Sequence, residues 1–392
     1  MENPKIRFKG FTKDWEQRKL GDVFKEYSEK NHTELSALTI IQGGGTVKRE
    51  DSDRNLMYDT SNLSNYKMVR KDDFIVHLRS FEGGLEKSSL DGIISPAYHT
   101  FHSDMADSRF YYPYFRSYEF IKHKLVSHVY GIRDGRSIDI DGMKTIEIPY
   151  TSIEEQRKIG DYLDCLDHLI TLHQRKCEQT KNLKKYMLQK MFPQNRAKVP
   201  EIRFNGFTHD WEQRKFGSLL EETRNKTIFE DEDTLLSCAI DGMYLNSELF
   251  SHFRGSSNIG YLKVKKNDLI LSAQNLHLGN CNVNLRFEHG IISPAYKVYE
   301  LVGCNPLFMQ AWVKKDSTKD FFLKSSTEGA SVCRKNIVWE ELYKQELPVP
   351  SIEEQTKVGE YFYSLDHLIT LHQRQCDELK KMKKYMLQNM FI

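Results

Sequence analysis

The strongest constraint on the fold of this chain is an internal duplication. Residues 4–22 read PKIRFKGFTKDWEQRKLGD, and residues 200–218 read PEIRFNGFTHDWEQRKFGS. The heptapeptide GIISPAY occurs at residues 92–98 and again at residues 290–296. Matching blocks that recur at a nearly constant offset indicate that one structural unit is repeated. We therefore expect two copies of a single fold.

The two copies share a frame but differ inside it. Residues 27–90 have little in common with residues 223–288, and residues 99–148 diverge from residues 297–347. Drift after duplication would spread the differences over surface positions, whereas here the identity is confined to blocks. We interpret the pattern as one scaffold that presents two different recognition surfaces, with plain drift as the alternative.

A third repeated block opens a long helix in each copy. The motif S-I-E-E-Q begins at Ser152 and again at Ser351, and Ser-x-x-Glu is a capping box. Pro193 ends the first helix, which is predicted over residues 152–192. Apolar residues at alternating spacings of three and four indicate a coiled-coil seam. Its members are Leu163, Leu166, Ile170, His173, Cys177, Phe362, Leu365, Ile369, His372 and Cys376.

Two helices of this length predict the domain organisation. A helix of forty residues is roughly 60 Å long, which is too long to pack within one domain. We expect an α/β (mixed α+β) protein with a pseudo-twofold repeat, in which two long antiparallel coiled-coil helices join two globular recognition domains. Self-association of the chain through a coiled coil is the alternative. The predicted segments are residues 1–150, 151–193, 194–349 and 350–392.

Composition restricts the class of protein. The chain lacks a run of eighteen apolar residues, and its start lacks the apolar stretch of a signal peptide, so we expect a cytoplasmic protein. Seven scattered cysteines also suit a reducing compartment. The net charge of +2 is small for a protein that holds DNA alone. Basic residues would have to gather on one face, or partner chains would have to contribute.

If the chain binds DNA, two polar turns in the variable regions are candidates for contacts to bases. In the first copy a predicted strand runs into a glycine turn that carries Arg79 and Ser80. The matching stretch of the second copy carries Gln274, Asn275 and His277. Arginine pairs with guanine, and the side-chain amides suit adenine. Different residues at one frame position are what two readers of different targets require. Surface turns with polar tips are the alternative.

Basic residues near these turns are candidates for phosphate contacts, which position a protein on DNA without specifying sequence. A loop that starts at Gly131 is the strongest of them, because its glycines permit close approach of the backbone. Solvated charged loops are the alternative. The candidates are Arg70, Lys71, Lys87, Arg133 and Arg136 in the first copy, and Lys263, Lys265, Lys266, Arg334 and Lys335 in the second.

Motifs for catalysis are missing. The chain has no P-loop, and its histidines and cysteines lack metal-ligand spacing. The tetrapeptide that starts at Asn305 (NPLF) superficially resembles an adenine-methyltransferase motif but lacks the second proline. We interpret it as a turn that opens a helix over Leu307–Val313. We expect no catalytic residue, bound cofactor or metal in this chain.

The WEQR opening, the GIISPAY block and the S-I-E-E-Q helix start, each present twice, resemble the specificity subunit of Type I restriction–modification systems. The resemblance covers essentially the whole chain. It implies that the two variable regions are target recognition domains, each of which reads one half of a bipartite, asymmetric DNA site. It also implies that the helices set the gap between the half-sites and dock two modification subunits.

The resemblance further implies the partners and their chemistry. They are double-stranded DNA, two modification subunits that carry S-adenosylmethionine and methylate adenine N6, and restriction subunits that use ATP and Mg. This chain would be a non-catalytic subunit of that bacterial complex. A stand-alone dimerising DNA-binding or scaffold protein without such partners is the main alternative. A self-sufficient methyltransferase is a second one.

Overall fold

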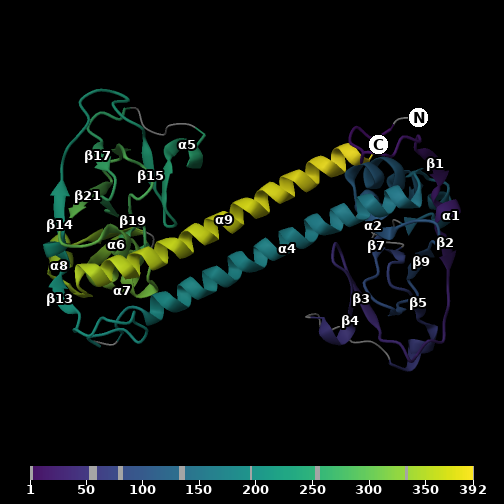
Figure 1. The fold of residues 1–392 in the computed structure, drawn as a ribbon, viewed down its shortest axis with the longest axis horizontal. Helices are drawn as coiled ribbons and strands as arrows, with labels where there is room; N and C mark the ends of the chain where they lie inside the picture. Colours follow the sequence, from purple (N-terminus) through teal and green to yellow (C-terminus); the bar gives the residue numbers. More distant parts are fainter. Residues whose placement is uncertain are drawn as a thin grey trace. The chain divides into compact units, whose positions relative to one another are not determined.

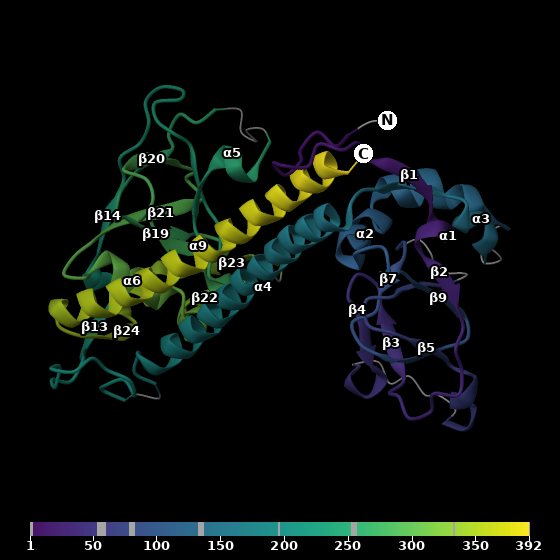
Figure 2. The same ribbon diagram turned by 45° about the vertical axis from the view of Figure 1, so that its right-hand side comes forward.

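The computed structural model describes residues 3–52, 60–77, 83–131, 137–194, 197–251, 257–331 and 334–391. It divides into two compact units (Figures 1 and 2). Unit 1 comprises Met1–His173 and Arg374–Ile392, and unit 2 comprises Gln174–Gln373. Each unit therefore combines one globular copy with part of both long helices.

Unit 1 is built on a four-stranded antiparallel sheet of order β2-β9-β6-β7. These strands are Lys25–Tyr27, Tyr98–His102, Phe74–His77 and Glu86–Lys87. Strand pairs beside it are β3–β4 (Leu38–Ile41, Gly45–Lys48), β5–β8 (Lys67–Val69, Gly92–Ile94), β1–β12 (Glu16–Lys19, Glu147–Tyr150) and β10–β11 (Val129–Tyr130, Ser137–Ile138). The helices are α1 (Leu20–Val23), α2 (Ser108–Phe115) and α3 (Ile140–Lys144).

Unit 2 repeats this topology, with a sheet of order β14-β21-β18-β19. These strands are Leu220–Thr223, Tyr296–Leu301, Leu269–Ser272 and Cys281–Val283. The pairs are β15–β16 (Leu236–Cys238, Met243–Leu245), β17–β20 (Leu262–Lys265, His289–Ile292), β13–β24 (Glu212–Lys215, Glu346–Val349) and β22–β23 (Ser326–Ser331, Arg334–Ile337). The helices are α5 (Asn246–Leu249), α6 (Pro306–Val313), α7 (Asp316–Lys324) and α8 (Trp339–Lys344). The mixed α/β fold with an internal repeat is confirmed.

The GIISPAY blocks are structural, as their apolar pattern indicates. Their Ile-Ile pairs are fully buried in β8 and β20. A Cβ at Gly92 would lie 2.5 Å from Cγ of Leu38, and a Cβ at Gly290 would lie 2.6 Å from the Leu236 side chain. Each block therefore needs glycine because a leucine of the neighbouring hairpin packs directly against its backbone.

Each core is rich in aromatic side chains that pack on the long helices. Trp15 is buried in the unit 1 core together with Leu163 and Leu166, and Trp211 is buried in unit 2 with Phe362. Burial of each large apolar side chain contributes roughly 1.5–3 kcal/mol. The WEQR blocks therefore pack each domain onto the long helices.

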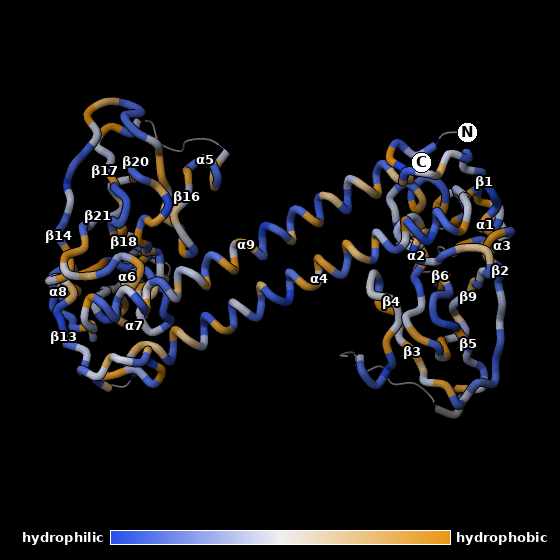
Figure 3. Tube along the Cα trace, in the orientation of Figure 1, coloured by the Kyte–Doolittle hydropathy of each residue, from blue (hydrophilic) through white to orange (hydrophobic). Residues whose placement is uncertain are grey.

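The long helices are α4 (Ile153–Lys190) and α9 (Ile352–Met390). In unit 1, Lys383 of α9 donates to Asp167 of α4, and in unit 2, Lys184 of α4 donates to Asp366 of α9 at 2.5 Å. Apolar and polar residues alternate along both helices (Figure 3). Of the seam residues, Leu163, Leu166, Ile170, Cys177, Phe362, Leu365 and Cys376 are buried, whereas His173, Ile369 and His372 are half-buried.

Candidate nucleic-acid interface

The start of each long helix holds a globular domain through the S-I-E-E-Q glutamate. The hydroxyl of Ser152 accepts from the backbone NH of Glu155 at 3.3 Å, which is half of the predicted capping box. The Glu155 carboxylate does not complete the box. It accepts instead from Nε and Nη2 of Arg7, at 2.6 and 2.8 Å, and from Nε1 of Trp15 at 3.1 Å. The repeated frame is thus tied to the helix by a buried ion pair.

The second copy contains the same ion pair. Nε and Nη2 of Arg203 donate to Glu354 at 2.7 and 2.8 Å. The carboxylates raise the pKa of Arg7 and of Arg203 by accepting these hydrogen bonds. Among the described residues, Nε1 of Trp211 has no hydrogen-bond partner. Neither arginine was among the predicted site residues, although both lie in the repeated PKIRF and PEIRF segments.

The glutamine of the same motif holds the next helix of the domain. The Gln355 side chain accepts from the backbone NH of Asn305 at 2.7 Å, and Gln156 accepts from the NH of Asp107 at 3.0 Å. Asn305 in turn caps α6 by accepting from the NH of Leu307 at 2.9 Å. The NPLF segment is therefore a helix start, as predicted from its sequence.

The predicted reading residues of the second copy lie on one loop after β18. The hydroxyl of Ser272 accepts from the backbone NH of Asn275 at 3.1 Å, and the loop ends at Gly279, whose φ is +89°. The backbone NH of Lys335, on β23, donates to the carbonyl of Gln274 at 3.1 Å. The structure thus places the strand of Lys335 next to the loop that carries Gln274 and Asn275, a proximity that the sequence did not indicate.

His277 lies on this loop but is largely buried, with 8% of its surface exposed. Within the described ranges, neither of its ring nitrogens has a hydrogen-bond partner, and neither does Oδ1 of Asn280. Burial and the charge of Lys335 both lower the pKa of His277, which favours the neutral imidazole. The loop therefore holds buried polar atoms for which the described residues provide no partner.

The predicted phosphate-binding residues mostly engage carboxylates. Such exposed pairs contribute about 0–1 kcal/mol, so a phosphate could displace the carboxylate at small cost. Whether these residues bind DNA stays a prediction. The pairs are Arg70–Glu29 (2.7 Å), Lys87–Asp72 (3.0 Å), Lys263–Glu232, Lys265–Glu300 (3.4 Å) and Lys266–Glu288 (2.5 Å).

Of the predicted contacts that remain, Lys71 alone has a described side chain. Arg79, Ser80, Arg133 and Arg136 lie outside the described residues. Arg334 belongs to β23, and its side chain is likewise outside the description. Lys71 is exposed, and its backbone NH donates to Asp91 at 2.7 Å.

One basic residue beside the loop of Gln274, Lys319, was not among the predicted site residues. Lys319 of α7 places its Cε 3.3 Å from where a Cβ at Gly279 would stand, and its ammonium lies 3.5 Å from Asp316. Nothing in the sequence connects α7 with the loop, because forty residues separate them. In the part of the chain that the structure describes, no cluster of three metal-capable side chains occurs, and no helix has the length and apolarity to span a membrane.

Part of the chain is similar to a known protein domain family. Residues 12–182 match the family model of the Type I restriction modification DNA specificity domain. The matched region spans the first copy from its opening block into α4, and the same blocks recur in the second copy. The first copy is thus similar to the Type I restriction modification DNA specificity domain.

Individual members of the specificity family resemble the chain over long stretches. The Type I restriction enzyme MjaVIII specificity subunit of Methanocaldococcus jannaschii is 23% identical over 266 residues, which are 63% of this chain. The match spans 61% of the length of that relative. The crystal structure of the S subunit of a Type-I restriction-modification system from M. genitalium has a TM-score of 0.61 and 16% identity. It covers 100% of this chain and 99% of its own. This second likeness concerns the fold.

Proposed function

We propose that this chain is the DNA-specificity subunit of a Type I restriction–modification complex. One observation carries the proposal: two copies with the same strand order and the same attachment to a long helix differ in the loop after the central strand. That loop contains Gln274 and Asn275 in the second copy, and the sequence places Arg79 and Ser80 at the same frame position in the first. Each domain would read one half of a bipartite site.

The roles of the subunits are those that the resemblance to Type I specificity subunits implies. Side chains of the loops would contact base edges, basic residues around them would contact phosphate, and α4 with α9 would set the gap between half-sites. Two modification subunits would dock on the helices and supply S-adenosylmethionine for methylation of adenine N6. Restriction subunits would supply ATP- and Mg-dependent cleavage. The chain itself would contribute recognition and assembly without a catalytic residue.

Mapping of methylated adenines tests this proposal. The chain is expressed with its modification subunit, and N6-methyladenine is mapped across the host genome. We expect methylation within one bipartite motif, which disappears when this chain is omitted. Replacement of residues 23–148 by the corresponding region of another specificity subunit should change one half of the motif and leave the other intact.

The alternative function predicts a different result. A stand-alone dimerising DNA-binding or scaffold protein would bind its site tightly by itself and support no methylation. Tight binding by the purified chain alone, together with an unmethylated genome, would establish that alternative. If both halves of the motif changed in the chimaera, the assignment of one reader to each copy would be wrong.

A further inference from the structure

Lys315, which lies between α6 and α7 of unit 2, is a buried cation without a counter-charge. Only 8% of its surface is exposed, and its ammonium has no hydrogen-bond or ion-pair partner among the residues that the structure describes. Its Nζ lies 4.7 Å from the centroid of the Phe192 ring, which is a cation–π contact. Burial alone lowers the pKa of this lysine, to about 8. A buried charge is costly unless it is paired, so this position favours a bound anion.

The start of α7 adds two free donors next to this lysine. Lys315 is the N-cap residue of α7, and no side chain caps the helix. The backbone NH of Thr318 donates to the carbonyl of Lys315 at 3.1 Å, whereas the NH groups of Asp316 and Ser317 have no partner in the described part of the chain. A lysine side chain cannot accept a hydrogen bond, so the helix start stays open to an acceptor from outside. Free NH groups and the helix dipole attract anions to such a position.

The first copy closes the matching position with a serine. Ser117 corresponds to Lys315 at an offset of 198 residues, and its hydroxyl accepts from the backbone NH of Phe120 at 3.1 Å. Serine is among the residues that most often cap a helix start. The second copy thus has a cation where the first has a cap. The open site is therefore a property of the second recognition domain and not of the shared frame.

Lys315 lines a groove of about 1,040 Å³, whose lining combines the start of α7 with the end of α4. The fully buried polar atoms without a partner in the described residues do not include its nitrogen, which therefore stays open to the groove. Lys314 lines the same groove but is occupied. Its ammonium donates to the carbonyls of Ile240 and Cys281, at 2.7 and 3.0 Å. The two neighbouring lysines thus differ, because one braces the fold and the other is available to a ligand.

Carboxylates in the lining of the groove do not neutralise Lys315. None of them raises the pKa of this lysine, whereas a carboxylate close to its ammonium would do so. Three of them form ion pairs with other lysines of unit 2. These pairs are Lys319–Asp316 (3.5 Å), Lys190–Glu201 (2.5 Å) and Lys184–Asp366 (2.5 Å).

Helix α7 connects this site with the loop after β18. Lys319, one helical turn beyond Lys315, places its Cε 3.3 Å from where a Cβ at Gly279 would stand, at the end of the loop that carries Gln274. Four residues of helix rise by roughly 6 Å, which is about two nucleotides at 3.4 Å each along one DNA strand. A strand whose bases face the loop would therefore bring a backbone phosphate within reach of Lys315.

We propose that Lys315 and the start of α7 bind one phosphate group in this groove. The ammonium offers three N–H donors and the helix start offers two more, which suits the several oxygens of a phosphate. The DNA backbone and free phosphate carry the same group. The DNA source rests on the proposed function, whereas binding of free phosphate does not.

NMR of lysine side chains tests the site without DNA. The full chain is labelled with carbon-13 at the lysine ε carbon, and the Lys315 signal is the one that Lys315→Met removes. We expect about 20 mM inorganic phosphate, in place of chloride at equal ionic strength, to raise the titration midpoint of this signal by at least about 0.5 pH units. The signal of Lys344, an exposed lysine of α8 that pairs with Glu341, should not respond.

A second variant keeps the test independent of folding defects. Lys315→Ser installs the helix cap of the first copy, so the variant should fold as the wild type does. Inorganic phosphate should raise the unfolding temperature of the wild-type chain and leave that of Lys315→Ser unchanged. The proposal is overturned if phosphate moves the Lys315 signal no more than the Lys344 signal, or if it stabilises both chains equally.

DNA titrations identify the source of the phosphate. Binding of a duplex to the complex of this chain with its modification subunits is measured at several salt concentrations. If the DNA backbone supplies the phosphate, Lys315→Ser should weaken binding several-fold and reduce the slope of log K against log salt by about one, whereas Lys344→Met should not. An unchanged slope, together with the response to inorganic phosphate, would assign the site to a free phosphate. A chain that binds phosphate but supports no methylation would disprove the proposed function alone.

Discussion

Arg7 donates two hydrogen bonds to the carboxylate of Glu155, at 2.6 and 2.8 Å, across 148 residues of sequence. The Glu155 side chain is 1% exposed, and the arginine is 14% exposed. Removal of one partner of such a pair leaves an uncompensated buried charge, which costs about 3–5 kcal/mol. The opening segment of each copy is therefore held on its helix by charge as well as by apolar packing.

Loss of this arginine should destabilise the chain. We expect Arg7→Met to lower the free energy of unfolding by about 3 kcal/mol and Arg203→Met to have a similar effect, measured by urea denaturation. Lys344→Met is the control, because the Lys344–Glu341 pair is exposed and should contribute less than about 1 kcal/mol. Equal effects of Arg7→Met and Lys344→Met would contradict a structural role for the buried pair.

Stability should depend on pH through Asp268. Burial raises the pKa of this carboxyl to about 6, from an ordinary value of 3.8. Because the fold disfavours the ionised form, stability falls as pH rises from about 4 to about 6 and then stays level. Asp268→Asn removes this loss and keeps an oxygen to accept from the NH of Lys265.

The Asp268→Asn variant should therefore unfold at a higher temperature than the wild type at pH 7.5 and at nearly the same temperature at pH 4. The difference in unfolding free energy should reach about 2–3 kcal/mol. Asp316→Asn, at an exposed position, serves as the control. A gain that is independent of pH would show that ionisation of Asp268 is not its cause.

The loop after β18 should control one half-site. We expect Gln274→Ala and Asn275→Ala to relax the base preference at one or two positions of one half-site, with a loss of about ten-fold in discrimination per position. Lys319→Ala should weaken binding to all sequences and reduce its salt dependence. Genome-wide methylation profiles and binding titrations at two salt concentrations distinguish the effects. Changes in both half-sites would contradict the assignment.

The long helices should set the spacing between half-sites. Insertion of seven residues into both α4 and α9, in phase with the seam, lengthens each helix by roughly 10 Å. The methylated motif should then acquire a spacer longer by about two to three base pairs, given 3.4 Å per base pair. The half-sites themselves should stay the same. An unchanged spacer would contradict the role of the helices, provided that the variant still supports methylation.

The repeat, the helices and the buried strands could be predicted because they depend on local patterns. Alternating spacings of three and four residues specify the seam, Pro193 stops α4 after Lys190, and the apolar pattern of the Ile-Ile pairs is typical of buried strands. The capping boxes show the limit of local reasoning. Ser152 caps α4, but Glu155 is taken by Arg7, a residue that local sequence around the helix does not include.

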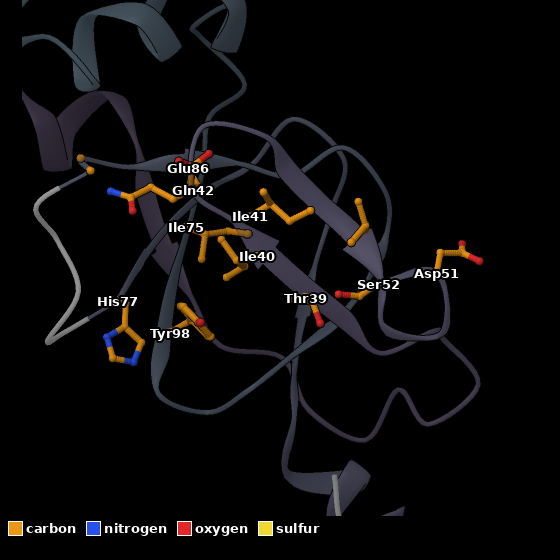
Figure 4. A pocket seen from close by; sticks show the side chains of 13 residues that line it. Thr39, Ile40, Ile41, Gln42, Asp51, Ser52, Ile75, His77, Glu86 and Tyr98 are labelled. Carbon is orange, nitrogen blue, oxygen red and sulfur yellow. The ribbon is translucent and has the colours of Figure 1, made fainter. Parts of the chain in front are cut away.

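The sequence by itself determined that this chain holds two copies of one frame with different interiors, and this pattern was enough to indicate its resemblance to Type I specificity subunits. Tertiary structure decided which side chains meet. It placed Lys335 and Lys319 beside the loop of Gln274, and it left Lys315 without a counter-charge. In the first copy it formed a cavity whose lining includes His77 and Tyr98 (Figure 4). The reason is physical: helices and strands follow short-range periodicity, whereas sites and cavities depend on distant side chains that pack against one another.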